Sequence, residues 1–409
     1  MNLYCVYICK LIIPKMNQLK RLFILFLLVI TSYSFAQIQV EDNKFRLNTI
    51  TTSVPFLIIS PDAKAGGMGD VGVASTPDAM SMHWNPAKYA FVKNDVGFSL
   101  CYTPWLKSLV PDINLSYLTG YTRLDENQVL GFSLRYFTLG EINFTDANNN
   151  PLGSFNPNEF SLDGAYALKL SQRFSTGVAL RYVYSNLTGG QQVGTLATKA
   201  AHTVAGDISG YYTKEVRLAG QKIDWAMGLN ISNIGAKVSY TETVDKDFIP
   251  TNLRIGSSLA TDIDEYNQLA FEFNVNKLLV PTPPIYNEDG DIISGQDPDV
   301  SVISGIFQSF SDAPYNDREV RELIYSTGVE YWYDQQFAVR SGFFYEHPSK
   351  GDRQFFTLGA GVRYNVFGLD FSYLIPLQGR DEVNAVNPLS NTLRFALTFD
   401  FSELEQVEN

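Results

Sequence analysis

A two-residue alternation between apolar side chains and polar or small ones recurs along most of this 409-residue chain. Side chains two positions apart share one face of a β-strand, so each such segment predicts a strand with one apolar and one polar face. About fourteen strands can be counted, and the pattern predicts an all-β protein. In residues 130–136 the apolar face carries Leu130, Phe132, Leu134 and Tyr136, and similar segments occupy residues 174–184, 225–232, 269–276, 356–364 and 393–400.

The links between these segments favour a membrane barrel over a soluble sandwich. Short links, such as residues 124–127 and 334–336, alternate with long ones, such as residues 138–158 and 278–318. Outer-membrane barrels have short periplasmic turns, long external loops, a lipid-facing apolar band and aromatic residues near the strand ends. We therefore predict a transmembrane antiparallel β-barrel in which an added charge is costly at Leu134, on the lipid face, and tolerated at Ser133, in the lumen. The charged lumen residues either line a transport path or pair with one another: Arg135, Arg181, Arg254, Glu272, Arg363 and Asp370.

The chain begins with a stretch typical of a secretory signal peptide. Lys20 and Arg21 precede the apolar run 22–30, and a small-residue cleavage pattern ends at Ala36, with Met16 as an alternative true start. We therefore expect a signal peptide over residues 1–36, followed by insertion in the outer membrane of a Gram-negative cell. Without the leader's basic residues, 27 Lys and Arg face 43 Asp and Glu, and a net charge of −16 argues against a nucleic-acid partner. Cys101 is then the single cysteine, so no intramolecular disulfide forms.

A glycine-rich stretch at residues 65–72 raises the question of nucleotide binding. Gly67, Gly69 and Gly72 have the spacing of a dinucleotide fingerprint, which acts only between a strand and a helix. Pro61 breaks the apolar run before it, and Pro77 ends the stretch after it without a helical pattern. We therefore interpret the glycines as positions of positive φ or close backbone packing, with an ordinary glycine-rich turn as the alternative.

The segment 51–91, which precedes the first strand and does not alternate, resembles the N-terminal signature of the PorV family. These are outer-membrane barrels of the type IX secretion system whose fold is similar to that of the FadL fatty-acid transporters. The resemblance implies that residues 37–92 form an N-terminal segment folded into the lumen as a plug, that residues 93–402 form the barrel, and that 403–409 are a C-terminal tail. The residues that carry it are Ser60, Pro61, Asp62, Ala63, Ala65, Gly66, Gly67, Met68, Gly69, Asp70, Val71, Gly72, Trp84, Asn85, Pro86 and Ala87.

The same resemblance implies a non-enzymatic role in secretion. A PorV-like protein binds the C-terminal signal domains of cargo at a SprA/Sov-type translocon and delivers them to a PorU-type sortase and attachment complex. Two alternatives remain open: a FadL-like transporter of hydrophobic small molecules, and a lipid A modifying (deacylation) protein. Apart from these protein partners, we expect contact with outer-membrane lipid.

Side chains for catalysis or metal binding are sparse in the sequence. The three histidines, His83, His202 and His347, lack metal-site spacing, and no nucleophile elbow with a paired base is present. We therefore expect no catalytic site, metal or cofactor.

Two external loops are more apolar than solvated loops usually are. One carries Trp105, Leu106 and Leu109. In the other, residues 278–318, a short amphipathic helix is predicted from Ile303, Ile306, Phe307 and Phe310. These side chains either cap the lumen of their own barrel or bind a partner.

Overall fold

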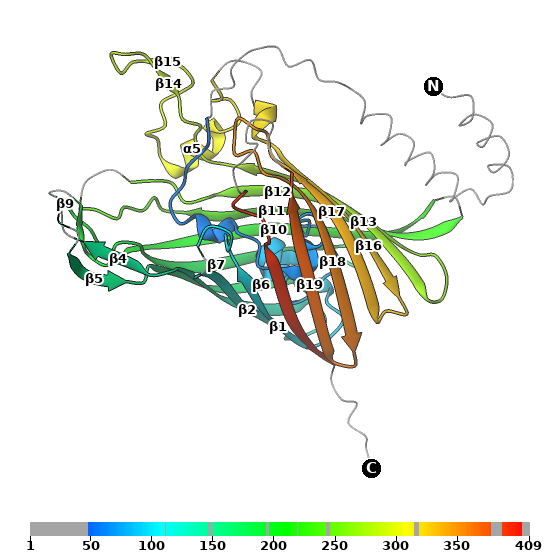
Figure 1. Ribbon diagram of the computed structural model, residues 1–409. Helices are drawn as coiled ribbons and strands as arrows, with labels where there is room; N and C mark the ends of the chain where they lie inside the picture. Colours follow the sequence, from blue (N-terminus) through cyan, green and yellow to red (C-terminus); the bar gives the residue numbers. More distant parts are fainter. Residues whose placement is uncertain are drawn as a thin grey trace, which may run out of the picture.

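The computed structural model describes residues 48–402 except 111, 146–147, 149, 194–195, 219, 243–245, 315–318 and 378–386. The expected signal peptide and the tail 403–409 lie outside these residues. Within them, fourteen strands form one closed barrel in which every neighbouring pair is antiparallel (Figure 1). This confirms the predicted barrel and its strand number. The barrel strands are β1 Val96–Pro104, β2 Ile113–Arg123, β3 Gln128–Leu139, β6 Asn158–Lys169, β7 Phe174–Asn186, β10 Ala201–Leu218, β11 Gln221–Gly235, β12 Asn252–Asp262, β13 Asn267–Leu278, β16 Ile324–Tyr333, β17 Phe337–Tyr345, β18 Gln354–Tyr364, β19 Phe367–Pro376 and β20 Leu393–Phe401.

The side-chain register of the barrel follows the alternation in the sequence. In β3, Leu130, Phe132 and Leu134 point outward and are exposed, whereas Ser133 and Arg135 are buried inside. The expectation that Ser133 would tolerate a charge is wrong, however. Its hydroxyl donates to Asp163 Oδ2 at 2.5 Å and the side chain is buried, because the lumen here is packed rather than filled with water.

The two ends of the barrel differ in the length of their connections. One end has turns of a few residues, such as those after β2 and β16, and β1 begins there beside the end of β20. The other end carries the long connections, with the hairpins β4–β5 (Ile142–Thr145, Pro151–Phe155), β8–β9 (Gln192–Val193, Leu196–Ala197) and β14–β15 (Ile285–Tyr286, Ile292–Ser294), the helix α5 (Val302–Gln308) and the 3-10 helix η4 (Glu319–Glu322). By the usual polarity of outer-membrane barrels, the short turns face the periplasm and the long loops face outward.

The described segment from Pro55 to Val92 lies inside the barrel, as the blue segment in Figure 1 shows. Its short helices are η2 Pro55–Ile58, α3 Ala63–Gly66, α4 Ser81–Trp84 and η3 Pro86–Phe91. Nearly all side chains from Ser60 to Ala90 are buried, and they pack against inward-facing residues of the wall such as Tyr117 and Ala396. Among the described residues, no helix is long and apolar enough to cross a membrane.

Candidate functional site: the barrel interior and the external loops

The interior segment, residues 60–92, is hydrogen-bonded to strands all around the barrel. Gly69 N donates to Thr357 Oγ1 of β18 at 2.8 Å. On the opposite side, Asn85 Nδ2 donates to Gly210 O of β10 at 3.0 Å, and Asn230 of β11 donates to Trp84 O at 3.0 Å. Buried backbone groups need such partners, and here the wall supplies them. The motif residues Trp84, Asn85 and Ala87 therefore connect the interior segment to the wall.

Glycines on both surfaces allow the interior segment to approach the wall closely. A Cβ at Gly228 would lie 1.9 Å from Val73 O, and one at Gly342 would lie 2.0 Å from the Met68 carbonyl carbon. Of the four motif glycines, only Gly69 has a positive φ, +74°. Positive φ is therefore found only at Gly69, and the expected close packing applies at Gly66, Gly67 and Gly72. They are needed for space instead: a Cβ at Gly67 would lie 2.8 Å from Gly359 Cα, and one at Gly72 would meet the Trp84 ring.

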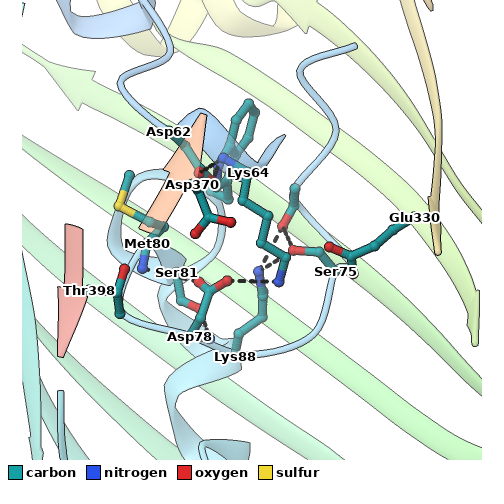
Figure 2. A network of polar contacts seen from close by, with 12 residues as sticks. Asp62, Lys64, Ser75, Asp78, Met80, Ser81, Lys88, Glu330, Asp370 and Thr398 are labelled. Carbon is teal, nitrogen blue, oxygen red and sulfur yellow. Dashed lines mark hydrogen bonds and ion pairs between the residues drawn. The ribbon is translucent and has the colours of Figure 1, made fainter. Parts of the chain in front are cut away.

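A network of buried charges holds the interior segment together (Figure 2). Lys64 Nζ lies 3.0 Å from Asp78 Oδ2. Lys88, which is fully buried, donates to Gly72 O at 2.9 Å and to Ser75 Oγ at 2.7 Å. Asp62 accepts a hydrogen bond from Trp84 Nε1 at 2.9 Å, and burial together with nearby Asp78 raises the pKa of Asp62 to about 6. Sequence reasoning missed Lys64, Asp78 and Lys88, because composition and periodicity do not mark the positions of buried charged residues.

Arginines of the wall form ion pairs inside the barrel, one with the interior segment and the others between neighbouring strands. Arg394 forms an ion pair with Asp70 at 2.5 Å, and Arg181 pairs with Asp163 at 2.6 Å and Asp207 at 3.2 Å. Arg340 similarly pairs with Glu330 and Asp370, and Arg363 with Asp370. These contacts favour the interpretation in which lumen charges pair structurally.

Arg135 and Arg254 instead donate to backbone carbonyls of the segment before β1. Arg135 Nη1 contacts Phe56 O at 2.9 Å and Leu57 O at 2.6 Å, and Arg254 Nη1 contacts His83 O at 3.4 Å. Arg135 also contacts His83 Nδ1 at 2.7 Å. Burial and the charges of Arg135 and Arg254 hold the pKa of His83 well below its usual value, so this imidazole is neutral and accepts from Arg135.

A cavity of about 410 Å³ lies at the outer mouth of the barrel, above the interior segment. Phe56, Phe137, Phe344 and Leu374 line it, and Trp105 folds back from its loop into the same site. Leu106 packs there as well, against a cluster that includes Phe355 and Leu389. Arg254, Arg353 and Arg394 add polar atoms to this otherwise apolar wall. The arrangement can hold an apolar molecule of small size.

The predicted amphipathic helix is present as α5, but it presents its apolar side chains to the outside. Its buried side is formed by Gly305 and Ser309, and a Cβ at Gly305 would meet the Phe248 ring at 2.9 Å. Ile303 is 59% exposed, Phe307 73% and Phe310 49%, while Ile306 is half-buried. Leu109 of the first loop is also exposed. Exposed apolar side chains gathered on one element mark an interaction surface.

One group of carboxylates among the described residues has the spacing of a metal site. Oxygens of Asp312, Glu319 and Glu322 lie within 4.8 Å of one another. Glu322 is already paired with Lys277 at 2.5 Å and with Lys350 at 2.7 Å. These two ammonium groups neutralise most of the charge that would attract a metal ion. We therefore interpret the three carboxylates as part of an ion-pair network that holds the loop in place.

The chain matches the model of a known protein family. The family model of the type IX secretion system protein PorV matches residues 41–285, which is more than half of the chain. The chain belongs to the PorV family. Family membership indicates a component of type IX secretion, and together with a closed barrel whose outer wall is apolar it indicates an outer-membrane protein.

Solved structures of similar shape include a toluene transporter and a FadL homologue. The toluene transporter TodX of P. putida is 11% identical, with a TM-score of 0.48 and coverage of 83% of this chain and 98% of TodX. A Pseudomonas aeruginosa FadL homologue is 12% identical, with a TM-score of 0.41 and coverage of 87% and 99%. At these scores the likeness assigns no function, and the fold assignment rests on the closed sheet itself. No curated protein matches the chain.

Proposed function

We propose that this PorV-family protein is a non-enzymatic carrier of secreted proteins. It binds the C-terminal signal domains of cargo at a SprA/Sov-type translocon and passes them to a PorU-type sortase and attachment complex. In this proposal the interior segment is a plug that closes the lumen, so cargo is held from outside rather than passed through the barrel. The exposed loops are then the working surface.

The observation that carries the proposal is the orientation of α5. A helix that only closed its own barrel would bury Ile303 and Phe307 and expose its small residues, but α5 does the opposite. Leaving large apolar side chains in water is unfavourable by roughly 1.5–3 kcal/mol each relative to full burial. A protein partner that covers them would recover this free energy.

The packing of the interior supports the plug role. The interior segment packs closely against the wall at two places, since a Cβ at Gly228 or Gly342 would overlap its backbone. Ion pairs from β20 and hydrogen bonds from β10, β11 and β18 fix the segment to the wall.

The test replaces Ile303 and Phe307 together by Ser. We expect normal barrel assembly, measured as heat-modifiable mobility, with reduced co-purification of the translocon or of cargo. The matched control is Ile142→Ser, which changes an exposed apolar residue of a different external hairpin. Full co-purification by the double variant, or an equal loss in the control, would contradict the assignment of the surface.

The mouth cavity favours a second candidate, transport of a hydrophobic small molecule. Its lining is apolar and aromatic, and its volume suits a compact ligand. Deletion of the gene separates the two candidates. Lost secretion of cargo with unchanged uptake of hydrophobic substrates excludes the transporter, and the reverse result excludes the carrier. The lipid A modifying alternative stays a hypothesis, with no supporting observation among the described residues.

A further inference from the structure

A second apolar cavity, of about 340 Å³, lies on the outside of the barrel near its outer end. Its floor is the outward face of β12 and β13, where Ile255 is paired directly with Val275. Further along the same face, Leu259 is paired with Phe271, and Leu259 and Phe273 are exposed. The floor of this outer groove is therefore a continuation of the lipid-facing wall.

The roof of the outer groove comes from the long external loop. Phe310, which follows α5, together with Val320 and Leu323 at η4, overhangs the wall. A segment of the loop therefore turns down over the outer surface of the barrel.

Buried ion pairs hold this roof in place. Lys277 occupies an outward position at the end of β13, opposite Leu253, yet it is only 4% exposed. The ammonium group of Lys277 forms ion pairs with Glu322 at 2.5 Å and with Glu319 at 3.2 Å. It also lies 5.8 Å from the centre of the Phe310 ring. Lys350 pairs with Glu322 from a neighbouring loop at 2.7 Å. The roof is thus fixed from two sides.

We propose that the outer groove binds one acyl chain of an outer-leaflet lipid. The open side of the groove is continuous with the membrane-facing wall, so hydrocarbon is the material already in contact with it. Its walls are apolar, and its ionic groups, Lys277 and Glu319, already pair with each other. A polypeptide in the groove would leave its backbone groups without partners, because the backbone of β12 and β13 is already paired in the sheet. An acyl chain has no such groups to satisfy.

The proposal is independent of the carrier function, and it makes the lipid a fixed part of the outer surface beside α5. Binding of the chain would cover Ile255, Val275 and Leu323 while leaving Ile303 and Phe307 free. Lipid retention and partner binding can therefore be lost separately.

Native mass spectrometry of the full-length mature protein in detergent tests the proposal, with a lipid A of known mass as the probe. We expect one lipid to remain bound after activation that strips the others. Ile255→Trp, which fills the groove, should reduce this retention about tenfold, which corresponds to about 1.4 kcal/mol of binding free energy. Leu259→Trp, on the same face of the same strand but outside the groove, should leave it unchanged.

A second variant, Leu323→Ser, opens the roof without adding bulk and should also reduce retention, which keeps the test valid if Ile255→Trp does not fold. Equal retention by wild type and both groove variants would overturn the proposal. An equal loss of retention in Leu259→Trp would also overturn the proposal, since it would show that lipid binds around the whole barrel rather than in the groove. A co-purifying peptide that protects the groove instead of lipid would identify a protein occupant and contradict the proposal.

Discussion

The interior segment and helix α5 both depart from the strand pattern, yet they place their large apolar side chains in opposite environments. Met68, Trp84 and Tyr89 of the interior segment are buried, and the polar groups around them bond to the wall. Ile303 and Phe307 of α5 are exposed, and the helix rests on Gly305 and Ser309. From this difference we infer that the interior is stable by itself and that the proposed partner covers the external loop. Substitutions inside should therefore affect stability, and substitutions in α5 should affect binding.

The largest effect is expected from Gly228→Val. The new Cβ would lie 1.9 Å from Val73 O, and neither backbone can move because each is held by its own hydrogen bonds. We expect a loss of more than about 3 kcal/mol, above the usual range for overpacking, and failure to seat the interior segment. Heat-modifiable mobility and protease resistance measure this.

Gly164→Val is the matched control for that variant. Gly164 lies on the outward face of β6, and a Cβ there has no neighbour within 4 Å. Equal damage by both variants would show that valine disturbs strand pairing in general, and the close contact of segment and wall would lose its support.

The next effect, about 2–4 kcal/mol, is expected from Leu134→Arg, because it places a charge on the lipid-facing band. This variant distinguishes a side chain that faces lipid from one that faces water. Leu124→Arg, in the short turn after β2, should cost much less. Urea titration of the refolded barrel gives both values. If the turn variant is the more damaging one, the placement of the membrane band is wrong.

A smaller effect should appear as a pH dependence through His83. Its pKa is lowered in the folded protein, so below the usual value of 6.5 the unfolded chain binds a proton that the folded chain does not. Stability present above pH 6.5 is therefore lost as the pH falls, by at most about 1.4 kcal/mol per pH unit. His83→Gln keeps an acceptor for Arg135 and should lack this dependence. Parallel curves for wild type and variant between pH 7 and pH 5.5 would exclude the effect.

The smallest effect on stability is expected from Phe307→Ser. The side chain is 73% exposed, so its loss should change the unfolding free energy by no more than about 0.5 kcal/mol. A clearly larger loss in the urea titration would show that Phe307 packs against its own barrel and would weaken the contrast between the two regions.

The sequence predicted the barrel well because a strand with one apolar face repeats its pattern at every second residue. The outward positions of Leu130, Phe132 and Leu134 follow from that rule alone. The same rule could not reveal that the lumen is packed at Ser133, whose buried hydroxyl bonds to Asp163, and the tolerance expected there is therefore wrong. Nor could it locate Lys88, whose burial depends on carbonyl and hydroxyl oxygens brought to it by a separate turn.

Helix α5 shows a different limit of the sequence. Helical spacing correctly indicated a helix with an apolar face, but such a face is usually the buried one. The decisive contact is Gly305 against Phe248, two residues far apart in the chain, and no local pattern marks it. The position of Trp105 and Leu106 could not be predicted for the same reason. Both fold into the mouth cluster through contacts with distant strands.

Site-specific photocrosslinking in secreting cells tests the central claim most directly. A photoreactive amino acid would replace Phe307 in one strain and Phe56, inside the mouth of the barrel, in another. The account predicts that position 307 crosslinks to cargo or to a protein of the secretion machinery, and that position 56 crosslinks only within its own chain. Crosslinks to cargo from position 56 with none from position 307 would contradict it, because they would place the working surface inside the barrel.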